Sequence, residues 1–449
     1  MPPSPRRFAN THPGVVIGNF PWYEMVWRSL RGDFKPRSDP AGGYEAFARQ
    51  WSAPVDHARL AQRPQAPVVT WLGHVSILLQ VAGLNVLMDP TLCGFAGPLG
   101  RFGAPRRVPA PLTPEQLPPI DVVLISHNHY DHLCYGTLRR LRDAGQSPRF
   151  VVPLGLGGWF TQRGMGPVTE LNWWEHTDIA PGVRVHFTPA QHWSRRTPWD
   201  TNASLWGGYA LEWARPDAGD PWRFLFPGDT GYSDDFKAIR QRLGAVDFLA
   251  LPIGAYLPRD FMKPMHVNPE DAVQLMLDVD AKQAMGVHWG TFRLTQEAFD
   301  QPPRDLALAL RERGLPREQF SGMGQVFRKD GLISSPIEER ARYLNALSQD
   351  LSATLSRIDG VLFARVQLVL PERGSGSERD QSASAAVFIK HLQDSDLDLL
   401  QPQVRRLVVN SIPGLSMERV SVVLVPSAAL KKTSPSFENV LGIQVMVDS

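Results

Sequence analysis

The chain has 449 residues, of which 43% are hydrophobic and 20% are charged, and its formal net charge is +2. Such a length predicts two or three domains with complete hydrophobic cores. Because positive charge is neither abundant nor clustered, the composition argues against a nucleic-acid partner. No run approaches the eighteen apolar residues of a membrane-spanning helix, and the N-terminus lacks the apolar segment of a secretory signal. We therefore expect a cytoplasmic location.

The cysteine content is low, with Cys93 and Cys134 as the two cysteines of the chain. This number predicts no disulfide framework, and it favours a reducing compartment.

Tryptophan and charge divide the chain near residue 320. All thirteen tryptophans lie between Trp22 and Trp289, and residues 321–449 carry equal numbers of acidic and basic side chains. Such a shift in composition indicates a domain boundary. We expect four segments: an N-terminal extension at 1–65 that packs on the first domain, that domain at 66–320, a linker at 321–336 and a second domain at 337–449.

Short apolar runs alternate with turn residues and amphipathic segments in the first domain. The predicted strands are two or three within 68–90, with a turn at 82–83, followed by 121–126, 184–190, 207–214, 223–229 and 248–253. The predicted helices are 133–144, 234–244, 268–279 and 307–320. Strands in both halves with helices between them indicate a layered α/β protein.

The stretch SHNHYDHL (126–133) follows a buried strand and places four metal-ligand side chains within six positions: His127, His129, Asp131 and His132. Imidazole nitrogen and carboxylate oxygen are the ligands of zinc sites that keep a position open for water. A lone histidine after a strand is usually a solvent-facing or hydrogen-bonded residue, but this spacing is more specific. The pattern therefore predicts part of a metal centre.

One local cluster cannot complete two metal sites, so further ligands are expected from later strand ends. His192, Asp229 and His288 each follow a predicted strand. We assign His192 to a first site and His288 to a second. The expected sets are His127, His129 and His192 around one metal and Asp131, His132 and His288 around the other, with Asp229 bridging them.

These residues lie in segments that resemble the metallo-β-lactamase superfamily and, within it, N-acylphosphatidylethanolamine-hydrolysing phospholipase D. The resembling segments include WLGHVSILLQ, LPPIDVVLISHNHYDHL, TPAQHWSRR, FPGDTGY, PIGAYLPRDFMKPMHVNPEDAV and VHWGTF. The resemblance implies an αββα sandwich, two Zn²⁺ ions per chain and Asp131 as the residue that orients the nucleophile. It also implies a substrate or supporting hydrogen bond for His266. Gln191 is a further substrate-binding candidate, and the role of His74 is left open.

The same resemblance favours a phospholipid substrate, hydrolysed as by a phospholipase D, over soluble sugars or β-lactams. A lactone or a cyclic phosphodiester is the alternative for this fold. Aromatic residues alternate with arginines within 15–32, which suits peripheral contact with a membrane. The alternative is that these aromatics pack on the domain or on a dimer partner, and we expect a homodimer through the hydrolase part.

The second domain has its own pattern of elements. An amphipathic helix is predicted at 337–358, strands at 361–371, 385–390 and 419–426, and a second helix at 397–412. The order αββαβ predicts a small two-layer α+β domain. Its one histidine, His391, is isolated, so this domain is interpreted as non-catalytic.

Segments such as LSQDLSATLSRIDGVLFARVQLVLPER and VRRLVVNSIPGLSMERVSVVLVPS resemble the ring-building domain of the type III secretion inner-membrane ring lipoprotein. The resemblance implies a ring homo-oligomer or a secretion-ring partner, and peripheral attachment to the inner membrane. That family's lipidated cysteine, first ring-building domain and membrane helix are not matched. A structural ring component with a passenger hydrolase is therefore the alternative function. The abrupt junction of the two family segments suggests a gene fusion, a frame-joined reading or an engineered chimera.

Overall fold

The computed structural model describes residues 7–12, 15, 17–18, 20–216, 219–315, most positions of 347–358, and 361–369, 383–391, 400–412, 414–426, 435–440 and 443–448. The chain divides into two compact units, one centred on residues 1–307 and the other on 308–434. The expected linker at 321–336 lies outside the described residues.

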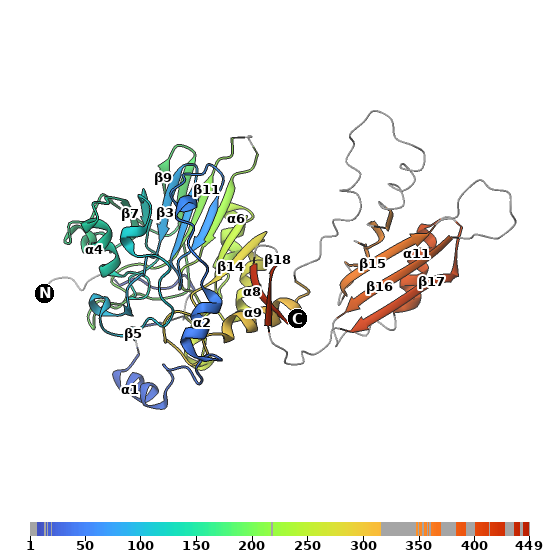
Figure 1. Ribbon diagram of the computed structural model, residues 1–449, viewed down its shortest axis with the longest axis horizontal. Coiled ribbons are helices and arrows are strands. Elements are labelled where there is room, and N and C mark those ends of the chain that lie inside the picture. The colour runs from blue at the N-terminus through green and yellow to red at the C-terminus, as the bar shows by residue number, and fades with distance from the viewer. Residues whose placement is uncertain are drawn as a thin grey trace. The chain divides into compact units, whose positions relative to one another are not determined.

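The first unit contains two six-stranded sheets (Figure 1). In spatial order the first sheet consists of β1 (Val68–Trp71), β2 (Ile77–Val81), β3 (Leu84–Met88), β6 (Val122–Leu124), β7 (Arg149–Pro153) and β8 (Val168–Leu171). The second consists of β14 (Gln283–Val287), β13 (Phe248–Pro252), β12 (Trp222–Phe226), β11 (Gly208–Trp213), β10 (Val183–Thr188) and β9 (His176–Ala180).

Alternating side chains along the strands fill two layers of the core. Ile77 and Leu79 of β2 belong to the cluster between the sheets, whereas Leu78 packs on the outer face with Leu138 and Phe160. That outer face is covered by α4 (Tyr135–Asp143) and α5 (Gly157–Thr161). On the second sheet, α8 (Pro269–Asp278) contacts β13 and α6 (Asp235–Leu243). The expected αββα sandwich is confirmed.

The predicted helices at 133–144, 234–244 and 268–279 correspond to α4, α6 and α8. The side chain of Asn268 caps α8 by accepting a hydrogen bond from the Asp271 N–H. The helix predicted at 307–320 is misplaced, because α9 runs from Gln301 to Glu312. Two prolines, at 302 and 303, suit the first turn of a helix, where no backbone N–H is needed. Gly314, with φ of 65°, follows the helix end.

Shorter elements complete the first unit. They are α1 (Trp22–Arg31), α2 (Gly43–Trp51), α3 (His57–Leu60), β4 (Phe95–Ala96), η1 (Pro98–Gly100), β5 (Ala104–Pro105), η2 (Pro114–Gln116) and α7 (Arg259–Met262). The N-terminal helices pack on the sandwich through specific contacts. Buried Asp33 accepts from Gln296 at 2.9 Å and pairs with Arg28 at 3.1 Å, and the buried Phe47 ring contacts Trp289.

Cys93 and Cys134 form a disulfide, a pairing that the sequence, with no disulfide framework expected, did not predict. Cys93 follows β3, and Cys134 lies in the loop between β6 and α4. Strands β3 and β6 are neighbours in the first sheet. The parallel pairing of β3 and β6 therefore brings together two cysteines that are 41 positions apart in sequence.

The second unit has a three-stranded sheet covered by a complete helix and by a helical segment within 347–355. The strands are β15 (Val361–Val369), β16 (Ala383–His391) and β17 (Leu415–Pro426), and α11 (Gln401–Ser411) contacts β17. Val387, Ile389 and Val404 lie in its buried core. The predicted strands and second helix are confirmed. The helix predicted at 337–358 is confirmed at the described positions within 347–355, whereas 337–346 lie outside the described residues. Two further strands, β18 (Pro435–Val440) and β19 (Ile443–Asp448), pair with each other, and residues 435–447 belong to the first unit.

Among the residues that the structure describes, no helix combines the length and the apolar character that crossing a membrane requires.

Tyr209 links the two sheets at the strand that leads into the histidine-rich turn. Its buried hydroxyl lies 2.9 Å from the carbonyl oxygens of Ile125 and Val151. Tyr209→Phe is expected to lower the free energy of unfolding by about 1–3 kcal/mol, because a buried carbonyl loses its donor. Urea denaturation of the full chain tests this, with Tyr135→Phe, at a half-buried ring, as the control. Equal midpoints for the two variants would contradict the proposed link.

Candidate metal centre

Strand ends position the predicted ligands. The histidine-rich turn follows β6, His192 follows β10, Asp229 follows β12 and His288 follows β14. Because these strands end at the same edge of the sandwich, side chains from distant parts of the sequence meet there. The structure brings all seven predicted ligands into two adjoining groups.

The first group contains His127, His129, His192 and Asp229. The Nε2 atom of His127 lies 2.8 Å from Nδ1 of His129, and Nε2 of His192 lies 3.2 Å from the same Nδ1 atom. Asp229 Oδ2 is 3.9 Å from the Nε2 atoms of His127 and His192. These are the ring nitrogens and the carboxylate oxygen that could converge on one cation.

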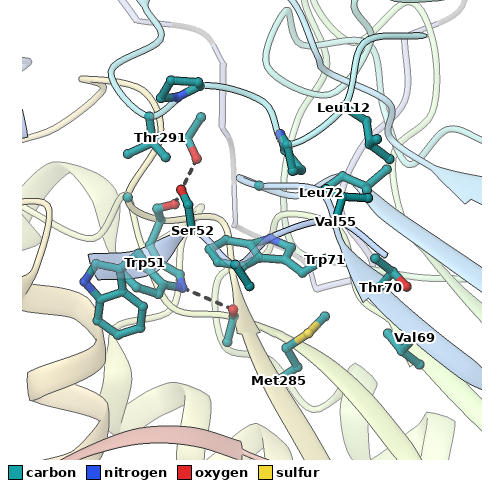
Figure 2. A pocket seen from close by; sticks show the side chains of 18 of the residues that line it. Trp51, Ser52, Val55, Val69, Thr70, Trp71, Leu72, Leu112, Met285 and Thr291 are labelled. Atoms are coloured by element: carbon teal, nitrogen blue, oxygen red, sulfur yellow. Dashed lines mark hydrogen bonds between the residues drawn. The ribbon is translucent and has the colours of Figure 1, made fainter. Parts of the chain in front are cut away.

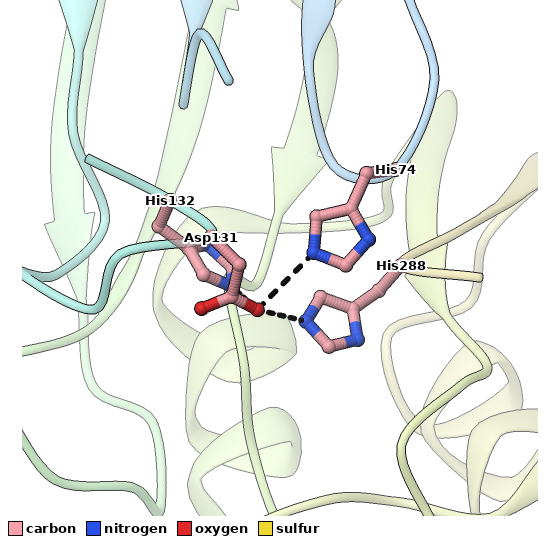
Figure 3. A group of neighbouring side chains, drawn as sticks. All are labelled: His74, Asp131, His132 and His288. Atoms are coloured by element: carbon pink, nitrogen blue, oxygen red, sulfur yellow. Dashed lines mark hydrogen bonds and ion pairs between the residues drawn. The ribbon is translucent and has the colours of Figure 1, made fainter. Parts of the chain in front are cut away.

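The second group contains Asp131, His132 and His288, together with His74 (Figure 3). Oδ2 of Asp131 lies 3.1 Å from Nε2 of His74 and 3.3 Å from Nε2 of His288. His74 comes from the turn between β1 and β2, where its φ is 53°. The sequence left its role open, and the structure places it against Asp131.

Asp229 lies between the two groups. Its carboxylate oxygens are 3.0 Å from His132 Nε2 and 3.1 Å from His288 Nε2, in addition to the two contacts with the first group. One carboxylate thus faces both groups, which is the position that a bridging ligand requires.

Asp89 supports the centre from behind, and the sequence reasoning missed it. Its carboxylate is 2.6 Å from Nδ1 of His132 and accepts a hydrogen bond from the Ser126 N–H at 2.7 Å. A carboxylate on the far nitrogen of a histidine fixes the ring and directs the other nitrogen toward the site. The sequence did contain one sign of this role, because Asp89 directly follows β3 and β3 lies beside β6, the strand that leads into the histidine-rich turn.

Arg196 holds the histidine-rich turn in shape. Its guanidinium donates at 2.8 Å to the carbonyl oxygens of both Asn128 and Leu133, which lie on either side of Asp131 and His132. The same group lies 4.1 Å from the centre of the Tyr130 ring. One side chain from the loop after His192 therefore ties both ends of the turn.

The two groups differ in electrostatics. Burial lowers the pKa of His127 and His129 well below the usual range, and it lowers that of His192 to about 4. Burial also opposes protonation of His132 and His288. Asp229 and Asp131 outweigh this effect and raise the pKa of His132 well above its usual value and that of His288 to about 9.

The pKa values of the two carboxylates are shifted downward. Burial would raise the pKa of Asp131 and Asp229, but His132 and the neighbouring histidines hold both pKa values well below the usual range. Negative charge is therefore concentrated between the groups, and cations would take the place of the protons on His132 and His288.

The donor set fits divalent metal ions. The Nε2 atom of His129 is buried without a hydrogen-bond partner, and such an atom is costly unless a ligand satisfies it. Neutral imidazoles and carboxylates in two groups joined by one aspartate match a two-metal hydrolytic site.

The two other predicted site residues lie beside the metal groups. His266 Nδ1 is 3.9 Å from Asp229 Oδ2, and burial lowers the pKa of His266 to about 3. The side chain of Gln191 has a structural contact, because its Nε2 atom donates a hydrogen bond to the Pro264 carbonyl at 2.8 Å. Its role as a substrate-binding residue stays a prediction.

An apolar cavity of about 700 Å³ lies between the edge strands β1 and β14 and the segment that carries α2 and α3 (Figure 2). Trp51, Trp71 and Met285 are among its walls. Gly73 and Thr291 also line it, and Thr291 Oγ1 accepts from the His74 N–H at 2.9 Å. The cavity is thus adjacent to the second metal group.

Removing the guanidinium of Arg196 is expected to loosen the metal centre. Arg196→Ala should weaken metal binding by about 10- to 100-fold, the usual effect of losing a group that orients metal ligands. Metal content after dialysis against graded chelator concentrations measures this. Arg195→Ala is the matched control, because Arg195 bonds the Thr197 carbonyl within its own loop. Equal metal retention by both variants would rule out the role of Arg196.

Two segments of the chain match known families. Residues 84–289 match the beta-lactamase superfamily domain, and residues 325–431 match the secretory protein of YscJ/FliF RBM domain. The first match contains all seven predicted metal ligands, together with Asp89 and Arg196.

Curated relatives align with each segment. The N-acyl-phosphatidylethanolamine-hydrolyzing phospholipase D 1 of Caenorhabditis elegans is 38% identical over 53% of this chain and 67% of its own length. The mitochondrial enzyme of that name from Saccharomyces cerevisiae is 37% identical over 53% of this chain and 51% of its own length.

For the C-terminal part, the Yop proteins translocation lipoprotein J of Yersinia pestis is 50% identical over 31% of this chain. The chain spans 59% of that lipoprotein and about half of the yeast enzyme. Through its first unit the chain belongs to the β-lactamase superfamily of metal-dependent hydrolases, and a YscJ/FliF-type ring domain is fused behind that unit.

Proposed function

We propose that the first unit is a dinuclear zinc phosphodiesterase that hydrolyses N-acyl phosphatidylethanolamine in the manner of a phospholipase D. The observation that carries the proposal is the convergence of the seven ligands on two adjoining groups within the aligned family segment. The relatives from C. elegans and S. cerevisiae support this substrate class by their names.

The first group would hold one Zn²⁺ through His127, His129 and His192, and the second would hold another through Asp131, His132 and His288, with Asp229 shared. Two bound divalent ions lower the pKa of a water molecule and neutralise charge on phosphoryl oxygens. His74 lies against Asp131, so it either helps to hold this carboxylate or is itself a ligand of the second group.

Asp131 and His266 are the residues that we assign to substrate and proton handling. Asp131 is held by His74 and His288 at its Oδ2 atom, which leaves its other oxygen to orient a water molecule and take up its proton. His266 is neutral near pH 7 because of its lowered pKa, so its ring can donate a hydrogen bond to a phosphoryl oxygen.

The reaction breaks the bond between phosphorus and the oxygen of the N-acylethanolamine. The water oxygen forms a new bond to phosphorus, and the proton removed from water passes to the leaving oxygen. The products are a phosphatidate and an N-acylethanolamine. The apolar cavity beside the second group suits a substrate with hydrocarbon chains better than a sugar.

The alternative substrate for the same centre is a lactone or a cyclic phosphodiester. Bound metal ions would supply an activated water molecule for either substrate, so the metal groups alone do not discriminate between the two. The identities of 38% and 37% to phospholipases D favour the lipid.

For the C-terminal part we propose assembly into a ring or attachment to a secretion-ring partner. The domain layout follows: an extension at 1–65, the hydrolase at 66–320, a linker at 321–336 and the ring-type domain at 337–449. In the alternative function, the protein is a structural component of a secretion ring, and the hydrolase domain is a passenger without a role in the ring. A homodimer through the hydrolase and a cytoplasmic location at the inner-membrane surface complete the proposal.

Asp229→Ala tests the enzymatic proposal most directly. Because Asp229 faces both groups, the variant is expected to lose bound metal and turnover of N-acyl phosphatidylethanolamine together. Metal analysis and product release from detergent-dispersed lipid measure the two effects. The control is Asp234→Ala, at an exposed carboxylate paired with Lys237.

Full turnover by the metal-free Asp229→Ala variant would refute the mechanism. Faster hydrolysis of a lactone or a cyclic phosphodiester by the unaltered chain would instead replace the proposed substrate.

The ring proposal predicts assemblies larger than a dimer in native mass measurements of the full chain. Phe388 and Val423 are paired in register and exposed on the three-stranded sheet, so they offer an apolar contact between subunits. Val423→Lys should shift the mass toward smaller species. Asn410→Lys, at an exposed position of α11, is the control. A monomer or dimer at high concentration of the unaltered chain would contradict ring building.

A further inference from the structure

The apolar stripe of α1 faces outward from the first unit. Tyr23, Val26, Trp27 and Leu30 follow the three- and four-residue spacing of one helix face, and their exposed fractions are 64%, 50%, 61% and 78%. An amphipathic helix normally turns such a face toward the core. Scattered apolar residues on a surface need no explanation, but a contiguous stripe on one helix marks a binding surface.

The opposite side of α1 is fixed to the fold. Met25 packs on an apolar cluster that includes Phe261 and Met262. Arg28 lies 4.4 Å from the centre of the Phe261 ring and pairs with Asp33 and with Asp260, at 3.1 and 3.2 Å. These contacts set the orientation of the helix, so the outward position of the stripe follows from packing.

The same cluster leads to the metal centre. Phe261 contacts Phe20 with ring centres 4.7 Å apart, Phe20 contacts Trp193 at 5.8 Å, and Trp193 contacts the ligand His129 at 4.7 Å. The Met265 carbonyl from this cluster lies 2.9 Å from Nδ1 of His192. The helix is therefore attached to the wall of the proposed catalytic site.

We propose that the outward face of α1 docks on the surface of a phospholipid bilayer. Tyrosine and tryptophan suit the headgroup level, where a ring can be half in water, while Val26 and Leu30 can enter the acyl region. At the Leu30 end the exposed Arg31 and Lys35 complement anionic headgroups. Glu24 and Asp260 are both paired with Arg28, which reduces their repulsion of such headgroups.

The biological role of bilayer docking by α1 rests on the proposed function, but the docking itself can be tested independently of that function. A hydrolase that takes its substrate from a bilayer needs its site near the bilayer surface, and the α1 contacts provide that proximity. Binding to vesicles, however, can be measured without any catalysis.

Co-sedimentation of the full chain with vesicles of phosphatidylcholine and phosphatidylglycerol tests the docking face. The unaltered chain is expected to bind, and the double variant Trp27→Ser, Leu30→Ser should bind at least tenfold more weakly. Leu277→Ser is the matched control, since Leu277 is 39% exposed on α8. Unaltered vesicle binding in the double variant, or an equal loss in the control, would overturn the proposal.

Two further measurements separate this proposal from its alternatives. If the double variant lowers the native mass of the protein and leaves vesicle binding intact, the face is a contact between copies of the chain, and bilayer docking is refuted. Turnover of N-acyl phosphatidylethanolamine should fall on vesicles and stay within twofold in detergent micelles. Loss of turnover in both forms would overturn selective docking, whereas no turnover by the unaltered chain would count against the proposed function alone.

Discussion

The buried carboxylate of Asp229 is the constraint on which the rest of the first unit depends. A charged group removed from water is costly unless opposite charge or strong donors surround it. Here it faces His132 and His288 at hydrogen-bond distance and His127 and His192 slightly farther away. Those partners come from three other strand ends. The two sheets must therefore be in register at this edge before the charge is compensated, which couples formation of the sandwich to formation of the site.

A second level of structure keeps those strand ends in place. Asp89 fixes the ring of His132, and Arg196 bonds both ends of the histidine-rich turn. Tyr209 links β11 to the end of β6 and to the middle of β7. Each of these groups uses a buried polar atom that would be unfavourable alone and is satisfied by the site or by the backbone around it. The metal groups thus rest on a polar network inside an otherwise apolar sandwich.

The sequence predicted which side chains come together better than it predicted the groups that support them. Candidate ligands are recognised by residue type at strand ends, so the spacing within 126–133 and the order of His192, Asp229 and His288 sufficed to name the residues that the structure brings together. Asp89 and Arg196 act through hydrogen bonds to residues far along the chain, and no periodic pattern marks such contacts. Edge strands such as β9, with the sequence HTDIA, escaped prediction because one exposed side leaves them little apolar alternation.

Other misses have the same physical origin. Pairing of the two cysteines depends on β3 and β6 being neighbours, which the chain order alone does not state. The periodicity of α1 defines an apolar face but not the direction in which it points. That direction is set by Arg28 and Met25, which hold the opposite side of the helix against the fold. For this reason the choice between packing and membrane contact required the structure.

Each of the two units has a core of buried apolar side chains. Within the described residues, the core clusters of the sandwich draw on residues up to Val287, and the core of the ring-type domain draws on Leu347 to Leu424. Since burial of apolar area dominates folding stability, each core stabilises the unit to which it belongs. Each of the two family matches therefore covers a segment that contributes apolar side chains to a core of its own.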